Sequence, residues 1–141
     1  MLLRFAKWRR KRQRQPNGNH GTVSLVTGLK IERYAAYWVH LDPVVGSEIA
    51  KTRPAVVVSD NAMNEVLETI VVCPVTSRVH PQWPSRVRVH LAEQSGEVAV
   101  DQIRTISRRR VGERIGVIDD AAAAQIRHII TEMYGLLSVE E

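Results

Sequence analysis

The sequence has one cysteine, one phenylalanine and no long apolar run. A single thiol excludes a disulfide framework and a thiolate metal cluster. No segment approaches the roughly 18 consecutive apolar residues of a membrane-spanning helix. What remains is a chain of 141 residues, 44% apolar and 25% charged, which is typical of one soluble globular domain. Cys73 lies in an apolar run, which predicts a buried, unreactive side chain.

The net charge of +5 is concentrated at one end of the chain. Residues 1–14 contain seven basic and no acidic side chains, which leaves 13 basic and 15 acidic residues elsewhere. Affinity of the folded part for a polyanion must therefore come from a local patch. We expect residues 1–32 to be a basic, disordered extension and residues 33–141 to be the folded domain. A non-specific nucleic-acid arm and a translation start placed too far upstream are the alternatives for the extension.

The basic start does not resemble a secretory signal, because no solid apolar stretch follows the charges. The expected location is therefore the cytoplasm, with no membrane association.

Short segments rich in β-branched residues follow Tyr34. Seven of them are predicted as strands, the last three more weakly: residues 37–42, 54–59, 69–76, 86–91, 97–100, 103–106 and 115–118. In residues 86–91 the apolar positions alternate with Arg86, Arg88 and His90, which predicts a half-exposed strand with a basic outer face.

The C-terminal segment has a different period. Asp119 or Asp120 can cap a helix whose apolar residues recur at spacings of three and four. This stripe predicts core packing by Ile126, Ile129, Ile130, Met133, Leu136 and Leu137. Many short strands followed by one helix favour a small, strongly bent, mainly β barrel.

The connection from Gly46 to Pro54 is longer and more polar than most hairpin loops. Pro54 keeps Arg53 extended at the entrance of a strand. RNA carries its own nucleophile, the 2′-hydroxyl, so its cleavage needs only a donor such as Arg53 at the phosphate and a base such as Glu48. Taken alone, the loop favours a structural turn in which Glu48 pairs with Lys51 or Arg53.

Two further polar groups end or interrupt predicted strands. Thr76 can place its hydroxyl at the rim of the sheet, and Gln102 can read the edge of an unpaired base. A mechanism based on histidine acid and base is the alternative. It leaves the Gly46–Pro54 loop unexplained, and no histidine pair has metal-binding spacing.

Three blocks, in this order, resemble the MazF/PemK toxins of bacterial toxin–antitoxin systems: residues 38–48 with 51–59, 73–77, and 100–105. The resemblance covers about Tyr37 to Leu137. It implies an SH3-like barrel of short antiparallel strands with a C-terminal α-helix, assembled as a homodimer. It implies an endoribonuclease that cuts single-stranded mRNA at a short preferred sequence, without a metal or other cofactor, leaving 2′,3′-cyclic phosphate and 5′-hydroxyl ends. It also implies a cognate antitoxin with an acidic, disordered tail.

The resemblance assigns catalysis to Arg53 and Thr76, with Glu48 supporting activity as in some members. RNA contacts are expected from seven further residues: Ser47, Lys51, Ser77, Arg78, Asp101, Gln102 and Arg104. One departure concerns Ala99, because the Kid/PemK branch has an acid-acting arginine there. Arg53 is then expected to act as the general acid, and the role of Asp101 as general base stays open.

The alternative function is a non-catalytic binding protein of the same fold. A CcdB-type gyrase poison would need a C-terminal Trp-Gly-Ile, which is missing here, and a decayed toxin would keep the fold alone.

Overall fold

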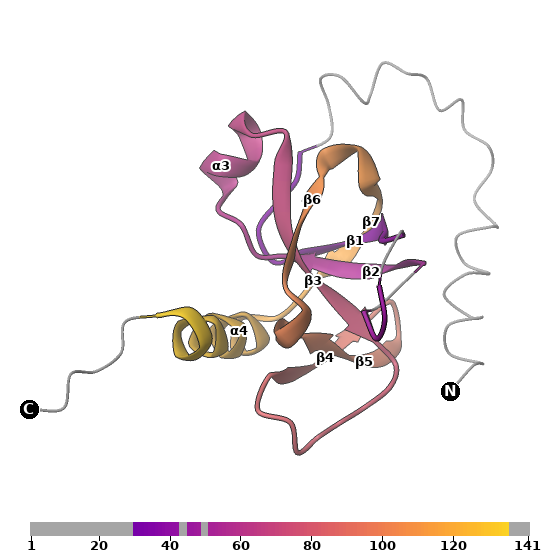
Figure 1. Ribbon diagram of the computed structural model, residues 1–141, viewed down its shortest axis with the longest axis vertical. Coiled ribbons are helices and arrows are strands. Elements are labelled where there is room, and N and C mark those ends of the chain that lie inside the picture. The colour runs from indigo at the N-terminus through magenta and orange to yellow at the C-terminus, as the bar shows by residue number, and fades with distance from the viewer. Residues whose placement is uncertain (1–29, 43–44, 49–50, 136–141) are drawn as a thin grey trace, which may run out of the picture.

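The computed structural model describes residues 30–42, 45–48 and 51–135, which form a strongly curled antiparallel sheet with a helix packed on it (Figure 1). The strands are β1 (Ala35–His40), β2 (Thr52–Val57), β3 (Thr69–Thr76), β4 (Arg86–Leu91), β5 (Gln94–Ala99), β6 (Arg104–Ser107) and β7 (Val111–Val117). The α-helices are α3 (Asn61–Val66) and α4 (Asp120–Tyr134), and short 3₁₀-helices follow β5 and β6 as η1 (Val100–Gln102) and η2 (Arg108–Arg110).

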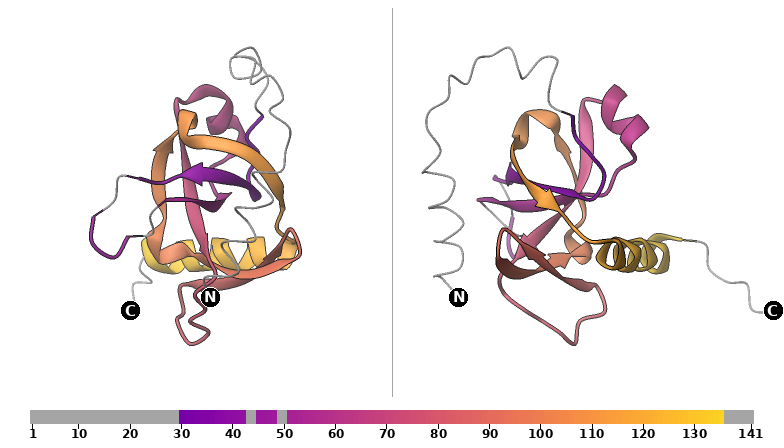
Figure 2. Two further views of the ribbon diagram at one scale, coloured as in Figure 1. Left: turned by 90° about the vertical axis from the view of Figure 1, so that its right-hand side faces the viewer. Right: turned by 180° about the vertical axis from the view of Figure 1, so that it is seen from behind.

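The sheet order is β4-β5-β3-β2-β1-β7, with β6 added to β3. The first half of β3 pairs with β6 and its last two residues pair with β5. This change of partner carries β3 across both parts of the sheet and curls it into a half-barrel (Figure 2). The predicted mainly β fold of bent antiparallel strands with a C-terminal helix is confirmed, and the predicted limits of β3 and β4 are those observed.

Strands β1, β2 and β3 are buried on both faces because two cores lie on opposite sides of the sheet. Alternate residues of each strand therefore enter different cores. The barrel core, inside the curl, contains Ile31, Ala35, Tyr37, Val39, Leu41, Ala55, Val57, Ile70, Val72, Ile106 and Val111. The helix-side core contains Ala36, Trp38, Val56, Val58, Cys73, Val75, Val87, Val89, Leu91, Val98, Val100, Ile118, Ala122, Ala123 and Ile126.

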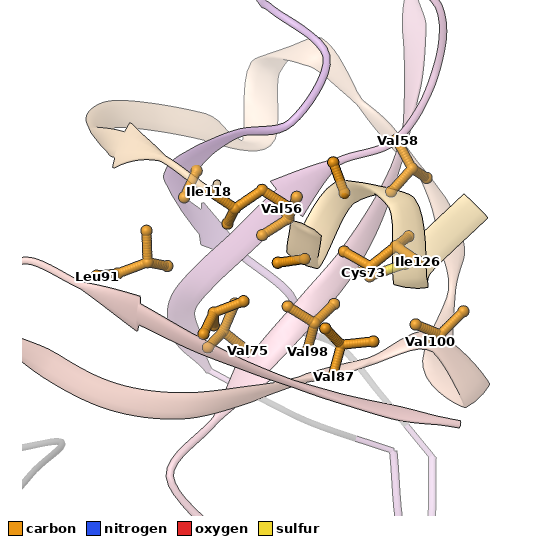
Figure 3. Close-up of a cluster of buried hydrophobic side chains, with 14 of the residues drawn as sticks. Val56, Val58, Cys73, Val75, Val87, Leu91, Val98, Val100, Ile118 and Ile126 are labelled. Carbon is orange, nitrogen blue, oxygen red and sulfur yellow. The ribbon is translucent and has the colours of Figure 1, made fainter. Parts of the chain in front are cut away.

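Helix α4 covers the helix-side core. Asp119 caps its first turn by accepting a 2.7 Å hydrogen bond from the backbone N–H of Ala122, a contact worth about 1 kcal/mol. Ile126 is fully buried against the valines of β2 to β5 (Figure 3), and Ile129 and Ile130 pack on the edge of the cluster. The predicted stripe is wrong at Met133, which is 40% exposed because the helix runs past the sheet there. The remaining predicted positions, residues 136 and 137, lie outside the described residues.

The packed body begins before residue 33, the expected domain start. Ile31 is only 4% exposed and belongs to the barrel core. The buried Tyr37 hydroxyl donates to the carbonyl of Lys30 (3.2 Å) and accepts from the N–H of Glu32 (3.0 Å). The expected basic extension lies, up to residue 29, outside the described residues. Within the described ranges, no helix is long and apolar enough to cross a bilayer.

Candidate active site

A cleft of about 510 Å³ lies where the β1–β2 loop meets the segment after β5. Its lining residues come from two distant parts of the chain and from the middle of β3: Ser47, Glu48, Pro74, Asp101, Gln102, Ile103 and Arg104. The structure thus brings together five of the residues expected from the sequence. Two of them come from the long hairpin connection and three from the polar interruption after β5.

Arg53 and Thr76 lie near strand ends, on the face of the sheet that Pro74 shares. The β2–β3 ladder ends with Ala55 opposite Pro74. Because side chains alternate along a strand, Arg53 and Thr76, two positions beyond these partners, share the face on which Pro74 lines the cleft. Neither residue is itself among the lining residues that the structure describes.

The Thr76 hydroxyl is held in a defined orientation. Thr76 is 6% exposed, and its Oγ1 accepts a 3.1 Å hydrogen bond from the backbone N–H of Arg78. A hydroxyl that accepts in this way keeps its own proton to donate. Thr76 can therefore donate a hydrogen bond to a phosphate oxygen that reaches the end of β3.

Among the described residues of the β1–β2 loop, two lie in the left-handed region. Gly46 has φ +61°, which favours glycine, and Lys51 has φ +69°. Glu48 is exposed, and its Oε1 accepts from the N–H of Val45 (3.3 Å). Asp42 stabilises the far end by accepting from the N–H of Lys51 (2.9 Å). These contacts place the Glu48 carboxylate at the mouth of the cleft.

Asp101 is anchored by a group that the sequence did not single out. Arg86 donates to it from Nε (2.9 Å) and Nη2 (3.4 Å), and Ser85 Oγ donates at 2.9 Å. The Arg86 side chain is 5% exposed. Both Asp101 oxygens already accept hydrogen bonds, so this carboxylate is suited to hold the cleft wall rather than to take a proton.

The strand register explains why Arg86 occupies this place. Arg86 stands opposite Ala99 in the β4–β5 pair, which is the position that lacks the arginine expected from the Kid/PemK branch. The guanidinium beside Asp101 therefore comes from the neighbouring strand. In the sequence Arg86 was one of three alternating basic residues, and only the register distinguishes it from Arg88 and His90.

The other expected RNA-binding residues differ in accessibility. Arg104 is half-buried, lines the cleft and donates from Nη1 to the carbonyl of Leu41 (3.3 Å). Lys51 and Arg78 are exposed outside it. Ser77 is 3% exposed, and its buried Oγ has no hydrogen-bond partner among the described residues.

Cysteine and histidine chemistry have no place in this cleft. Cys73 is fully buried, and burial, with a smaller effect of the Asp101 charge, raises the pKa of its thiol to about 12. This confirms the predicted inert cysteine. Among the described residues no histidine lines the cleft. His80 is stacked on Trp83 and His40 bonds to Thr52, so the described histidines offer the alternative mechanism no acid–base pair in this cleft.

Comparison with known proteins gives one consistent assignment. Residues 32–134 match the family model described as PemK-like, MazF-like toxin of type II toxin–antitoxin system. The chain is 25% identical over 114 residues to the endoribonuclease MazF of Staphylococcus saprophyticus, covering 77% of this chain and 95% of that protein.

Solved structures agree with that match. The crystal structure of MazF (Form-I) from Deinococcus radiodurans has 30% identity and a TM-score of 0.69, covering 77% of this chain and 99% of its own. MazE–MazF (Form-II) from the same organism has 26% identity and a TM-score of 0.63, with the same coverage.

Proposed function

This chain belongs to the family of PemK-like, MazF-like toxins of type II toxin–antitoxin systems and is an endoribonuclease, and we propose that it cleaves single-stranded mRNA at a short preferred sequence without a metal ion. The observation that carries the proposal is the cleft, whose lining combines the Ser47–Glu48 turn with the Asp101–Arg104 segment. Arg53 and Thr76 share the sheet face of Pro74, which also lines it.

The proposed reaction uses the substrate's own 2′-hydroxyl. Glu48 accepts its proton, the 2′-oxygen attacks phosphorus, and the P–O5′ bond breaks to leave a 2′,3′-cyclic phosphate. The leaving 5′-oxygen takes a proton from the Arg53 guanidinium, which regains a proton from water, and becomes a hydroxyl. Arg53 donates hydrogen bonds to the phosphate as its charge grows, and Thr76 holds a second phosphate oxygen.

The remaining groups bind and orient the RNA. Ser47, Gln102 and Arg104 line the cleft and present hydroxyl, amide and guanidinium groups to the bases and backbone. Lys51 and Arg78 are exposed outside it and attract phosphates. The remaining proposed RNA contacts are Ser77, which directly follows Thr76, and Asp101, which lines the cleft and is held there by Arg86.

The proposed partner is a cognate antitoxin, consistent with the family description and with the MazE–MazF neighbour. An acidic, disordered tail on that antitoxin would complement Arg104 and Lys51 and cover the cleft. The proposed assembly is a homodimer in the cytoplasm, as the family resemblance implies.

The function is tested by incubating the purified chain with single-stranded RNA in EDTA and resolving the fragments. We expect cleavage at a recurrent short sequence, unchanged by added Mg²⁺. Cleavage that appears only when Mg²⁺ is restored would refute the proposed chemistry. Glu48→Gln, which keeps the shape of the side chain, should slow cleavage, because its amide is not a base.

A further inference from the structure

The β3–β4 loop (residues 77–85) carries an exposed aromatic stack that the proposed reaction does not use. The rings of His80 and Trp83 lie parallel, 3.8 Å apart between centroids and 7° between planes. Trp83 is 45% exposed although it is the largest side chain of the loop. The guanidinium carbon of Arg86 lies 4.7 Å from the centre of the Trp83 ring. An exposed stack of this kind contributes little to either core, so its exposed surface is available to a ligand.

The stack is held in place at both ends of the loop. The backbone N–H of His80 donates a 2.7 Å hydrogen bond to Oε1 of Glu97, whose side chain is 2% exposed on β5. The N–H of Trp83 donates to the carbonyl of His80 (3.0 Å), and Arg86 is fixed by its two bonds to Asp101. A surface ordered in advance loses little conformational freedom when a ligand binds.

The stack is also connected to the cleft. Asp101 lines the cleft and bonds to Arg86, and Arg86 in turn contacts Trp83, so one continuous set of contacts joins the two places. Arg88 follows on the same face of β4 as Arg86 and is exposed. An RNA strand that leaves the cleft past Asp101 would meet the stack and then this positive charge.

We propose that the His80–Trp83 stack is a base-binding subsite, which accepts one unpaired base beside the nucleotides held in the cleft. The base adds a layer to the aromatic stack, and Arg88 attracts the neighbouring phosphate. The subsite rests on the proposed RNA cleavage and adds to it a further group that binds the substrate. Because every base has an aromatic face, the subsite contributes affinity at one position with little base preference.

The test uses an oligoribonucleotide that spans a mapped cut site, made resistant by a 2′-deoxyribose at that site. Each nucleotide in turn is replaced by an abasic one, and Kd is measured by fluorescence anisotropy. For the wild type, we expect one abasic position outside the cleft to weaken binding about tenfold. For Trp83→Ala, binding of the complete oligonucleotide should weaken by a similar factor, and that abasic position should have no further effect.

Trp83→Phe should keep both properties, because a phenyl ring also stacks. Tyr134→Ala is the matched control, since Tyr134 is an exposed aromatic residue (62%) at the end of α4, and it should bind as the wild type does. His80→Ala gives a second removal of the stack if Trp83→Ala folds poorly.

Equal Kd values and an unchanged abasic profile in Trp83→Ala would overturn the subsite. Weaker binding with the abasic profile intact would also overturn it, because this would indicate a purely structural role. Failure of the wild type to cut the all-ribose oligonucleotide would instead refute the proposed function itself. If the wild type cuts the all-ribose oligonucleotide but Trp83→Ala leaves both Kd and the abasic profile unchanged, the subsite alone is refuted.

Discussion

The β1–β2 loop lines the cleft, whereas the β3–β4 loop is joined to it through the Arg86–Asp101 pair, and the two loops are held by different kinds of contact. The β1–β2 loop carries Ser47 and Glu48, which are exposed, and the side chains of Asp42 and Glu48 accept hydrogen bonds from backbone N–H groups of the same loop. The β3–β4 loop is fixed by side chains from other strands, through a buried carboxylate at one end and the Arg86–Asp101 pair at the other. Figure 1 shows it reaching out beyond β4 and β5.

This difference matches the roles proposed for the two loops, which are catalysis for the β1–β2 loop and RNA binding for the β3–β4 loop. The proposed base, Glu48, is placed on backbone that folds through local turns, where a side chain can change at little cost in stability. The proposed aromatic subsite is placed on a loop anchored to the sheet. Variants of the proposed catalytic groups should therefore lower activity more than stability, and variants of the anchor of the second loop should do the reverse.

The largest effect is expected for Arg53, where the first loop enters β2. Arg53→Ala should lower kcat/KM for a short RNA about 10³-fold, because the donor to the developing phosphate charge is lost. The melting temperature should change little. Arg109→Ala, an exposed arginine of η2, is the matched control and should retain full activity. If Arg53→Ala retains most of its activity, Arg53 does not act at the phosphate.

A smaller effect, now on stability, is expected from the anchor of the second loop. Arg86→Met, Asp101→Asn and the double variant form a cycle whose coupling free energy should be about 2 kcal/mol in urea unfolding, since Arg86 is almost fully buried and the pair is bidentate. Arg114 and Glu32 form a more exposed pair at 3.3 Å. Their cycle should give well under about 1 kcal/mol. Equal couplings would mean that the Arg86 pair is an ordinary surface contact.

The smallest effect is expected at Gly46. A Cβ here would meet nothing within 4 Å, so Gly46→Ala tests only the positive φ of +61°. The left-handed conformation should cost about 1 kcal/mol of stability or shift the turn, with a modest loss of activity. Gly116→Ala in β7 also meets open space but at an ordinary φ, and should be close to neutral in thermal unfolding. If Gly46→Ala and Gly116→Ala have the same stability in thermal unfolding, the turn at Gly46 relaxes without loss of stability.

The parts of the fold that followed from the sequence are those with a clear hydrophobic pattern. Residues 69–76 are a continuous β-branched run because β3 is buried on both faces, and residues 86–91 alternate because β4 has one basic face. Helix α3 had no such pattern, since Asn64 is its one buried residue among the six. The β4–β5 turn was not predictable from the sequence either. Ala92 and Glu93 adopt positive φ there, where glycine or asparagine is typical.

The candidate site was predictable in its residue types but not in its connections. Pro54 and the polar Gly46–Arg53 segment pointed to a fixed arginine, and resemblance added the residues that follow β3 and β5. Arg86 and the His80–Trp83 stack were missed, because their roles depend on contacts across strands. A register such as Arg86 opposite Ala99 is set by pairing in space, and local sequence does not encode it.

The most direct test of the central claim is whether the RNA supplies its own nucleophile. An oligoribonucleotide with one 2′-deoxyribose at a mapped cut site is incubated with the enzyme in EDTA, beside its all-ribose counterpart, and the product ends are identified by mass spectrometry. We predict that the deoxy position is not cut, and that the all-ribose strand gives a 2′,3′-cyclic phosphate and a 5′-hydroxyl. Cleavage at the deoxy position, or products ending in a 3′-hydroxyl and a 5′-phosphate, would contradict the mechanism.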